Sequence, residues 1–218
     1  FLFEPTYRPQ PPVLVGHRIY MRPPLTADYR AWSALRERAA GSSNPEPVWG
    51  DHALSRGSYR GRINRVVREW NNDQGYSFHI FATGRDDIPR DTLLGGVNLN
   101  NVRRLSAQCC NLGYWMGEPY AGLGLMRAAL DVLLPFAFAT ANDDHPGLGL
   151  HRVDAACIPD NTPSRRLLQR CGFREIGRIT GAGIGLLRTR VGHAGTHAVA
   201  LGHAIGWHHG QIDEMRGR

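Results

Sequence analysis

A glycine-rich turn between a predicted strand and a predicted helix has the residue types and spacing of a phosphate-binding site. In residues 106–116, alternate residues ending with Tyr114 and Met116 are apolar, which is typical of a strand with one buried face. The turn at residues 117–124 follows, and apolar residues then recur at helical spacing. Glycines let the backbone approach a ligand closely, and the first amides of a helix are unpaired. The pattern therefore predicts an anion site at Gly122–Leu125.

Two other phosphate-binding motifs do not match this turn. A dinucleotide fingerprint needs a third glycine where Arg127 stands, and the elements before the turn resemble antiparallel strands rather than the start of a βαβ unit. A Walker loop ends in Gly-Lys-Ser/Thr, and the chain contains no lysine. The turn is thus expected to bind its anion mainly through main-chain amides.

Ser164 is the second candidate for chemistry. In a helix predicted over residues 163–171, Ser164 shares one face with Leu167, Leu168 and Cys171. A hydroxyl at the head of an apolar stripe is expected to point toward the sheet. The alternative is that Ser164 only satisfies an unpaired amide of the first helical turn, as serine often does. The pattern by itself leaves both interpretations open.

The composition favours one soluble domain with an anionic partner. A chain of 218 residues with 42% hydrophobic content can bury a sizeable core. All 26 basic residues are arginine, and the formal net charge of +7 favours a nucleotide, a ribosome or RNA. The four cysteines lack zinc spacing and are expected to be reduced. No apolar run is long enough to span a membrane, so we expect a cytoplasmic protein without a membrane partner.

The order of predicted elements indicates an α/β (α+β) fold with one central sheet. We divide the chain into an N-terminal arm at residues 1–12, a domain at 13–178 and an atypical tail at 179–218. Thr26 and Thr162 are predicted to cap helices. Strands are predicted at 17–21, 76–83, 92–100, 106–116 and 151–158, and helices at 27–40, 55–71, 125–138 and 163–171.

The predicted helix at 55–71 has an arginine-rich outer face. We interpret that face as solvated, and a contact surface for an acidic partner is the alternative. An RNA- or ribosome-binding module would use the same face. The residues concerned are Arg56, Arg60, Arg62, Arg65 and Arg68.

Several short motifs resemble the GNAT acetyltransferases. Residues 113–117 (GYWMG) followed by Gly122-Leu123-Gly124 resemble the acetyl-CoA pyrophosphate turn of that family. Three further motifs are similar to the RimJ/RimL branch: LHRVDA at 150–155, Asn161-x-x-Ser164, and LQRCGF at 168–173. That branch acetylates protein N-termini, notably those of ribosomal proteins. The resemblance covers about residues 15–176. Pro119 departs from it, because the family often has Gln or Arg three residues before the first glycine.

The resemblance implies a fold, a co-substrate and a set of contacts. It implies a mostly antiparallel sheet with a V-shaped splay between two parallel strands and helices on both faces. It implies acetyl-CoA as co-substrate, with no metal. Asn161 would hold the pantetheine arm, Ser164 would donate a hydrogen bond to the leaving sulfur, and an amide near Met116 would hold the oxyanion. The implied cofactor-binding residues are Tyr114, Trp115, Met116, Ala121, Gly122, Leu123, Gly124, Leu125, Asn161 and Ser164.

Direct attack of a neutral amine on the thioester favours a protein N-terminus as acceptor. An α-amine is roughly one-seventh neutral at pH 7, whereas a lysine side chain is neutral in about one part in 2,500. Glu118 and Asp154 are candidate bases, although each is also a plausible structural carboxylate and Asp154 can pair with Arg152. Tyr114 is a candidate acid or an aromatic wall. His79 is expected to be a satisfied sheet residue.

The acceptor and the assembly stay open at this point. A ribosomal-protein N-terminus, an aminoglycoside and a polyamine are the alternative acceptors, and a non-catalytic CoA-binding module is a further alternative. The protein is expected to be a monomer or a homodimer, and a ribosomal acceptor would place it close to the ribosome and its RNA.

The tail does not match the two closing strands that the resemblance requires. Residues 179–192 are Gly-rich, and a strand is predicted only at 196–201. His193 and His197 have metal-like spacing without an accompanying carboxylate or cysteine. We hypothesise that this segment is an aberrant end that leaves the edge of the sheet poorly covered.

Overall fold

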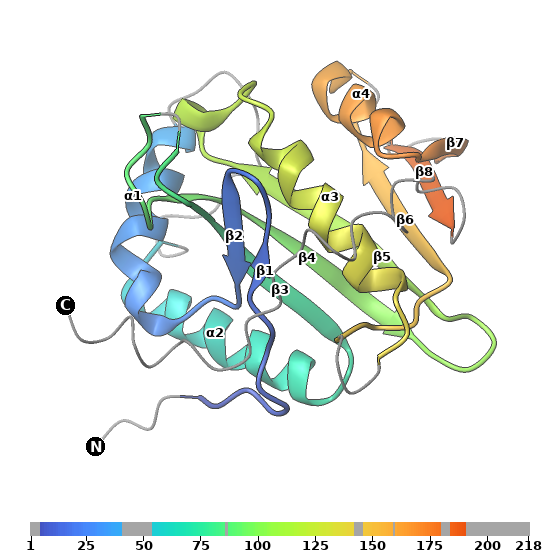
Figure 1. Cartoon of the computed structure of the whole chain (residues 1–218), viewed down its shortest axis with the longest axis horizontal. Helices are drawn as coiled ribbons and strands as arrows, with labels where there is room; N and C mark the ends of the chain where they lie inside the picture. The colour runs from blue at the N-terminus through green and yellow to red at the C-terminus, as the bar shows by residue number, and fades with distance from the viewer. Residues whose placement is uncertain are drawn as a thin grey trace.

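The chain folds around one twisted eight-stranded sheet (Figure 1). This computed structural model describes residues 5–40, 54–85, 87–141, 146–158, 160–179 and 184–190. The strand order is β1-β2-β3-β4-β5-β6-β8-β7, and β5 and β6 are parallel while the other neighbouring pairs are antiparallel. The strands are β1 Leu14–Val15, β2 Ile19–Arg22, β3 Gly75–Ala82, β4 Leu93–Arg103, β5 Cys109–Met116, β6 Arg152–Cys157, β7 Arg174–Ile179 and β8 Ile184–Arg190.

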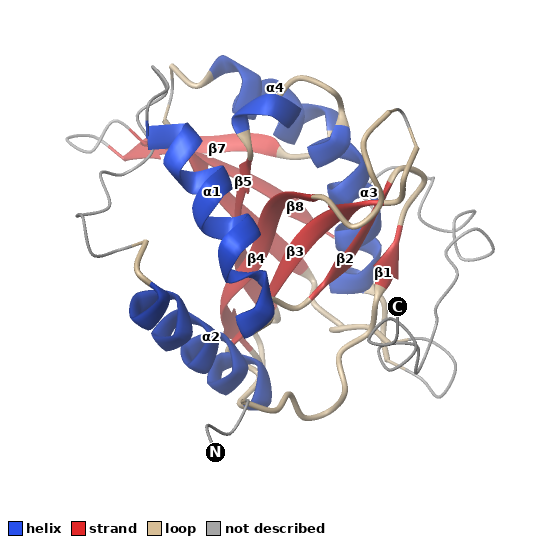
Figure 2. Cartoon of the chain, turned by 90° about the vertical axis from the view of Figure 1, so that its left-hand side faces the viewer, coloured by secondary structure: helices blue, strands red, loops and turns tan. Residues whose placement is uncertain are grey.

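Helices cover both faces of this sheet, as the resemblance implied (Figure 2). The helix α3 packs on one face and the pair α1 and α2 on the other, so the buried side chains form two clusters. None of the described helices combines the length and the apolar character that crossing a bilayer requires. The helices are η1 Thr26–Asp28, α1 Tyr29–Ala40, α2 Arg56–Asn71, η2 Glu118–Tyr120, α3 Leu125–Phe138 and α4 Thr162–Arg170.

The helix α3 forms because its apolar residues recur at helical spacing and find the sheet beneath them. Leu130 and Leu133 are fully buried. The ring of Phe136 meets that of Phe78 on β3 edge-on, with 5.8 Å between ring centroids. The helix thereby fixes where its own first turn lies relative to β5.

The predicted caps of two helices are wrong. At the start of α1, the main-chain amide of Leu25 donates to the Asp28 carboxylate at 2.8 Å, and Thr26 already belongs to η1. At the start of α4, the cap is Asn161, whose Oδ1 accepts from the Ser164 amide at 3.1 Å. At α4 the Asn161 side chain takes the capping role, whereas at η1 the Asp28 carboxylate accepts from the amide of the cap residue Leu25 itself.

The prediction that residues 179–192 form no strand is also wrong. Residues 184–190 form β8, which pairs with both β6 and β7. Leu187 and Thr189 are buried, so β8 covers one side of β6. Gly185, together with Gly181 and Gly183 just before it in the sequence, hid this alternation. The sheet thus continues beyond residue 178, and residues 191–218, with the predicted strand at 196–201, His193 and His197, lie outside the described residues.

A buried charged network fixes the start of α1 to the sheet. Arg22 of β2 donates two hydrogen bonds to the Asp28 carboxylate, at 2.6 and 2.8 Å. His79 of β3 places Nδ1 3.2 Å from the same carboxylate. Burial alone would raise the pKa of Asp28, but the hydrogen bonds from Arg22 and His79 outweigh it and hold that pKa below its ordinary value. His79 is the sheet residue that the sequence predicts, although its Nε2 is buried without a hydrogen-bond partner among the described residues.

We expect the free energy of unfolding to fall as the pH is lowered from about 7.5 to about 5.5. Burial lowers the pKa of His79 below its ordinary 6.5, and the charges of Arg22 and Arg62 add to this, although Asp28 opposes it. As the pH falls through 6.5, His79 is therefore protonated in the unfolded chain but stays neutral in the folded chain. This difference in proton uptake lowers the free energy of unfolding. The depressed pKa of Asp28 causes a second loss below its ordinary 3.8. Urea unfolding from about pH 7.5 to about pH 5.5 measures the effect of His79, and its extension below about pH 4 measures that of Asp28.

The matched control for that titration is His79→Asn. This variant is expected to start less stable but to show a flatter profile between about pH 7.5 and about pH 5.5. A wild-type profile as flat as that of the variant would contradict the assignment.

Candidate active site

The strands β5 and β6 separate part-way along their length, which opens a gap in the sheet (Figure 1). They pair from Cys109 with Arg152 as far as Leu112 with Ala155. Beyond that point, residues 113–116 pair only with β4, and residues 156–157 pair with β8. The predicted V-shaped splay is therefore confirmed. Each strand presents one unpaired edge of main-chain groups to the gap, and buried or ligand-facing edges require partners.

The glycine-rich turn lies beside this splay and is open. Gly122 and Gly124 both have φ of +77°, a left-handed conformation that favours glycine. A Cβ added at either position would meet no atom within 4 Å. Gly124 precedes α3, and in the described part of the chain nothing accepts a hydrogen bond from the amides of Leu125, Met126 or Arg127. The Arg18 guanidinium holds the turn by donating to the Leu123 carbonyl at 2.9 Å.

Tyr114 and Ser164 meet at the splay. Tyr114 extends from β5 two residues beyond the last β5–β6 pair, and its hydroxyl lies 2.6 Å from the Ser164 Oγ in the first turn of α4. Burial raises the pKa of Tyr114 to about 12, although the hydrogen bond with Ser164 lowers it. Tyr114 is therefore protonated at neutral pH. The Ser164 hydroxyl thus points toward the sheet, and Asn161 rather than that hydroxyl satisfies the first-turn amide.

The Tyr114–Ser164 contact is the feature of this site that the sequence does not reveal. The two residues are 50 positions apart, and no local pattern links them. The apolar helix face that includes Ser164 and the apolar strand face that includes Tyr114 each predict a side chain that points inward. Only the crossing of α4 over the splay brings the two hydroxyls together.

The other predicted cofactor contacts fall into two groups. The Trp115 side chain lies on the α1 side of the sheet, with the Arg36 guanidinium 4.9 Å from its ring centroid, whereas Met116 packs against the core under α3. The Trp115 side chain therefore points away from the face on which Tyr114 and Met116 lie. Ala121 and Leu123 are exposed in the turn, together with Gly122 and Gly124. Their cofactor contacts stay a prediction.

The candidate bases differ in their surroundings. Asp154 is held by Arg188, whose Nε lies 2.7 Å from Oδ1, and by Arg152, whose Nε lies 3.2 Å from Oδ2. These two arginines occupy the carboxylate, so the expected pairing of Asp154 with Arg152 is confirmed and Asp154 is a structural carboxylate. Glu118 is exposed in η2, at the end of β5. Over the described ranges, no three His, Cys, Asp or Glu side chains gather closely enough to hold a metal ion.

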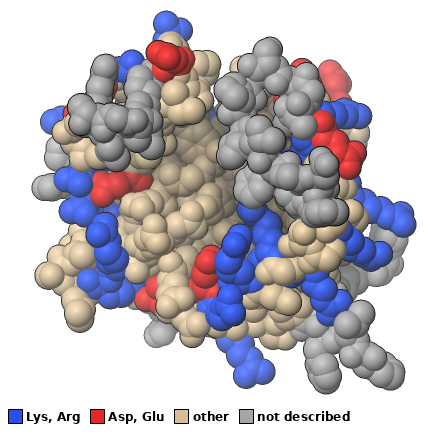
Figure 3. Space-filling model, turned by 180° about the vertical axis from the view of Figure 1, so that it is seen from behind, with Lys and Arg blue, Asp and Glu red and all other residues tan. Residues whose placement is uncertain are grey.

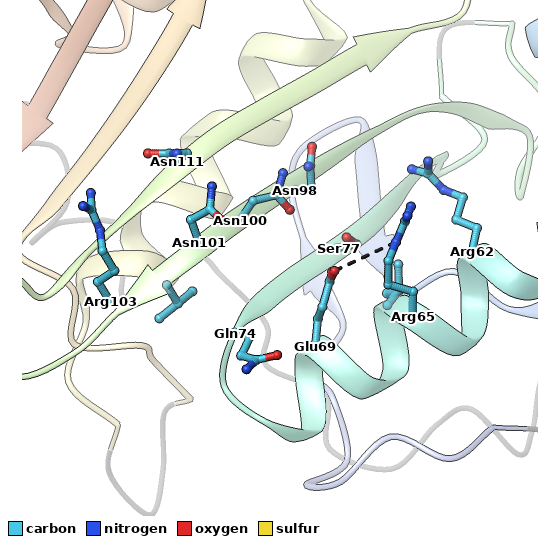
Figure 4. Close-up of a pocket in the computed structure, with 12 residues that line it drawn as sticks. Arg62, Arg65, Glu69, Gln74, Ser77, Asn98, Asn100, Asn101, Arg103 and Asn111 are labelled. Atoms are coloured by element: carbon cyan, nitrogen blue, oxygen red, sulfur yellow. Dashed lines mark ion pairs between the residues drawn. The ribbon is translucent and has the colours of Figure 1, made fainter. Parts of the chain in front are cut away.

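A polar groove lies on the opposite face of the sheet from α3. It encloses about 830 Å³ between α2 and the strands β3, β4 and β5 (Figure 4). In the register of the sheet, Ser77 pairs with Asn98 and Asn98 with Gly113, and Asn100 pairs with Asn111. Figure 3 shows this face hollowed, with arginines gathered at the sides of the hollow. This groove is not among the sites predicted from the sequence.

A sequence signal for the groove does exist. On β4, Asn98 and Asn100 alternate with the buried residues Val97 and Leu99. A strand that lies under α2 on one face and under α3 on the other is expected to be apolar on both. Asparagines on one face of a central strand therefore indicate a solvated floor.

Comparison with known proteins identifies the family. A family model described as the acetyltransferase (GNAT) domain matches residues 18–174. The chain is 29% identical over 166 residues to the probable N-acetyltransferase YjcK of Bacillus subtilis (strain 168), spanning 76% of this chain and 85% of that protein. It is 30% identical over 132 residues to the ribosomal protein uS5-alanine N-acetyltransferase of Escherichia coli (strain K12), spanning 61% and 62% of the two chains.

Solved structures share the fold. RimJ of Mycobacterium smegmatis, in complex with CoA-disulfide, superposes with a TM-score of 0.70 at 24% identity and covers 91% of this chain and 96% of its own. The ribosomal L7/L12 α-N-protein acetyltransferase RimL, in complex with coenzyme A, gives a TM-score of 0.69 at 16% identity, with 83% and 98% covered. RimJ/RimL enzymes are thus among the relatives and structural neighbours. The chain belongs to the GNAT family of N-acetyltransferases.

Proposed function

We propose that this protein transfers an acetyl group from acetyl-CoA to the α-amine of a protein N-terminus. The observation that carries the proposal is the splay between β5 and β6, with the Tyr114–Ser164 hydroxyl pair beside it and unpaired helix amides at its end. Relatives that are named for acetylating ribosomal-protein alanine support this acceptor class. A ribosomal acceptor would place the reaction in the cytoplasm.

The residues present fit the co-substrate. The open turn at Gly122–Leu125 and the dipole of α3 suit a diphosphate, and a helix N-terminus contributes about 0.3–2 kcal/mol to such binding. The free edges of β5 and β6 suit the amides of a pantetheine arm. When bound, acetyl-CoA supplies an acyl group activated as a thioester.

The hydroxyl pair is proposed to stabilise the departing sulfur through a hydrogen bond donated by Ser164. Tyr114 keeps its proton at neutral pH and can donate to the Ser164 Oγ, which leaves the serine proton free to point toward the splay. A thiol resembling that of cysteine, with a pKa of about 8.5, needs only modest help of this kind. Ser164 is therefore proposed as the donor and Tyr114 as the residue that orients it.

The oxyanion is proposed to lie against the amide of Met116. The amide of the next residue, Gly117, donates to the Leu94 carbonyl of β4 at 2.8 Å. Because successive amides of a strand point to opposite edges, the Met116 amide points to the splay. Glu118, exposed one residue beyond Gly117, stays the proposed base for the incoming amine.

We expect the protein to acetylate short peptides that begin with alanine or serine at the α-amine. Matched peptides with a blocked N-terminus and an internal lysine are the control, and they should gain no acetyl group, because the lysine amine is neutral in only about one part in 2,500. Thiol release and mass spectrometry of the peptide measure the reaction. Acetylation of an aminoglycoside or a polyamine without acetylation of any peptide would replace the acceptor, and acetyl-CoA binding without any thiol release would indicate a non-catalytic module.

A further inference from the structure

One end of the polar groove beneath α2, which we call its head, lies at Asn98 and Gly113 and borders the splay. Asn98 of β4 lies against Gly113 of β5, since a Cβ at Gly113 would stand 2.7 Å from the Asn98 Oδ1. Gly113 is the first residue of β5 beyond the last pair with β6. The groove is thus contiguous with the main chain that borders the splay, on the face away from α3. Its volume of about 830 Å³ is within the usual range for ligand sites.

The lining of this groove carries an excess of positive charge. The arginines Arg62 and Arg65 rise from α2 on one side, and Arg103 lies at the far end beside the asparagines of β4 and β5 (Figure 4). Among the described residues of the lining, Glu69 is the only acid, and it lies 3.9 Å from Arg65. Glu69 therefore neutralises one of the three arginines, and the other two can bind an anionic group of a ligand.

Arg62 is the one partly buried arginine of this lining among the described residues, since Arg65 and Arg103 are exposed. Its Nε is shielded from solvent and has no hydrogen-bond partner in the described part of the chain. Burial lowers the pKa of Arg62, and the nearby charges of Arg36 and Arg65 lower it further. A buried guanidinium is costly when unpaired, and its planar donors match a carboxylate. Arg62 also departs from the solvated outer face to which its sequence pattern assigned it, because it is half-buried in the groove.

We propose that the groove binds the acceptor chain and that Arg62 selects acceptors with a carboxylate within a few residues of the reacting amine. The inference rests on the proposed acetyl transfer to a peptide α-amine. With the amine at the head of the groove, beside Asn98 and Gly113, an Asp or Glu side chain near the N-terminus is placed to reach the guanidinium. The asparagines of the floor donate to and accept from the peptide main chain without adding charge.

The test is a comparison of peptides that differ in one side chain. Eight-residue peptides with alanine first and Glu, Gln or Lys at the second or third position are acetylated in parallel. We expect kcat/KM for the Glu peptides to exceed that for the Gln peptides by about ten- to a hundredfold, the usual effect of one hydrogen bond to a charged group. The Lys peptides should be the poorest, and added salt should narrow the difference.

Two variants assign the preference to a residue. Arg62→Gln should remove most of the preference by raising KM for the Glu peptides, with kcat and the rate on the Gln peptides little changed. Arg68→Gln is the matched control, because Arg68 is an exposed arginine of the same helix outside the groove. It should keep the preference. The thermal midpoint of each variant checks that it is folded, and the wild-type comparison stands without either variant.

The outcomes separate this inference from the proposed function. Equal acetylation of Glu, Gln and Lys peptides by the wild type, or a preference that survives Arg62→Gln, would overturn the role of Arg62 and leave peptide acetylation intact. Thiol release with no peptide acetylated would overturn the peptide acceptor, and the charge selection with it.

Discussion

Replacing Ser164 with alanine should lower kcat about a hundredfold while leaving the Kd for acetyl-CoA within about threefold of its wild-type value. The reason is geometric. The Ser164 hydroxyl lies at the splay and 2.6 Å from the Tyr114 hydroxyl, whereas the turn proposed to hold the diphosphate lies at the start of α3. Loss of the hydroxyl therefore removes a hydrogen bond to the leaving sulfur but no binding amide. Single-turnover kinetics and calorimetry with acetyl-CoA measure the two effects separately.

Further variants test whether the two hydroxyls act as one unit. Tyr114→Phe should also lower kcat, and the double variant should be little worse than Ser164→Ala alone, because residues in one hydrogen-bonded pair are not additive. Ser106→Ala, which removes an exposed hydroxyl from the turn between β4 and β5, is the control and should keep full activity. An unchanged kcat in Ser164→Ala would remove the assigned role.

Replacing Asp28 with alanine should destabilise the protein by about 3–5 kcal/mol, which is the usual cost of leaving one partner of a buried ion pair alone. The Asp28 side chain is 7% exposed and Arg22 is 15% exposed, so water cannot replace the lost carboxylate. Asp28 also accepts from the Leu25 amide at the start of the helical segment. Its loss therefore removes a cap as well as a charge. Urea unfolding, with the midpoint and the slope both recorded, measures the change.

An exposed ion pair provides the matched control. Asp131 lies 2.7 Å from Arg127 on α3, but the two side chains are 47% and 42% exposed. Solvent screens such a pair, so Asp131→Ala should cost about 0–1 kcal/mol. A loss in Asp28→Ala no greater than that in Asp131→Ala would show that the buried network adds little to the stability of the fold.

Local physics made much of the fold readable from the sequence. The alternation before the turn, the two left-handed glycines and the apolar stripe after them each depend on neighbouring residues, and the structure has a strand, an open turn and a helix there. The helix α2 likewise begins after Ser55, whose side chain accepts from the Ser58 amide as the pattern of a cap requires. The choice of sheet architecture followed from the order of these elements and from the family motifs.

Only the tertiary structure decided which distant residues meet. Tyr114 and Ser164 come together because α4 crosses the splay, and Asp28 is buried because β2 and β3 bring Arg22 and His79 to it. The strand β8 was missed because Gly185 weakens the local pattern, while pairing on both sides stabilises the strand. The positive charge of the groove depends on the Arg62 side chain, which lies in the groove. Helical periodicity along α2 does not specify that orientation. Periodicity reports which face a residue is on, whereas contacts across elements depend on how those faces pack, and that packing sets the chemistry of the site.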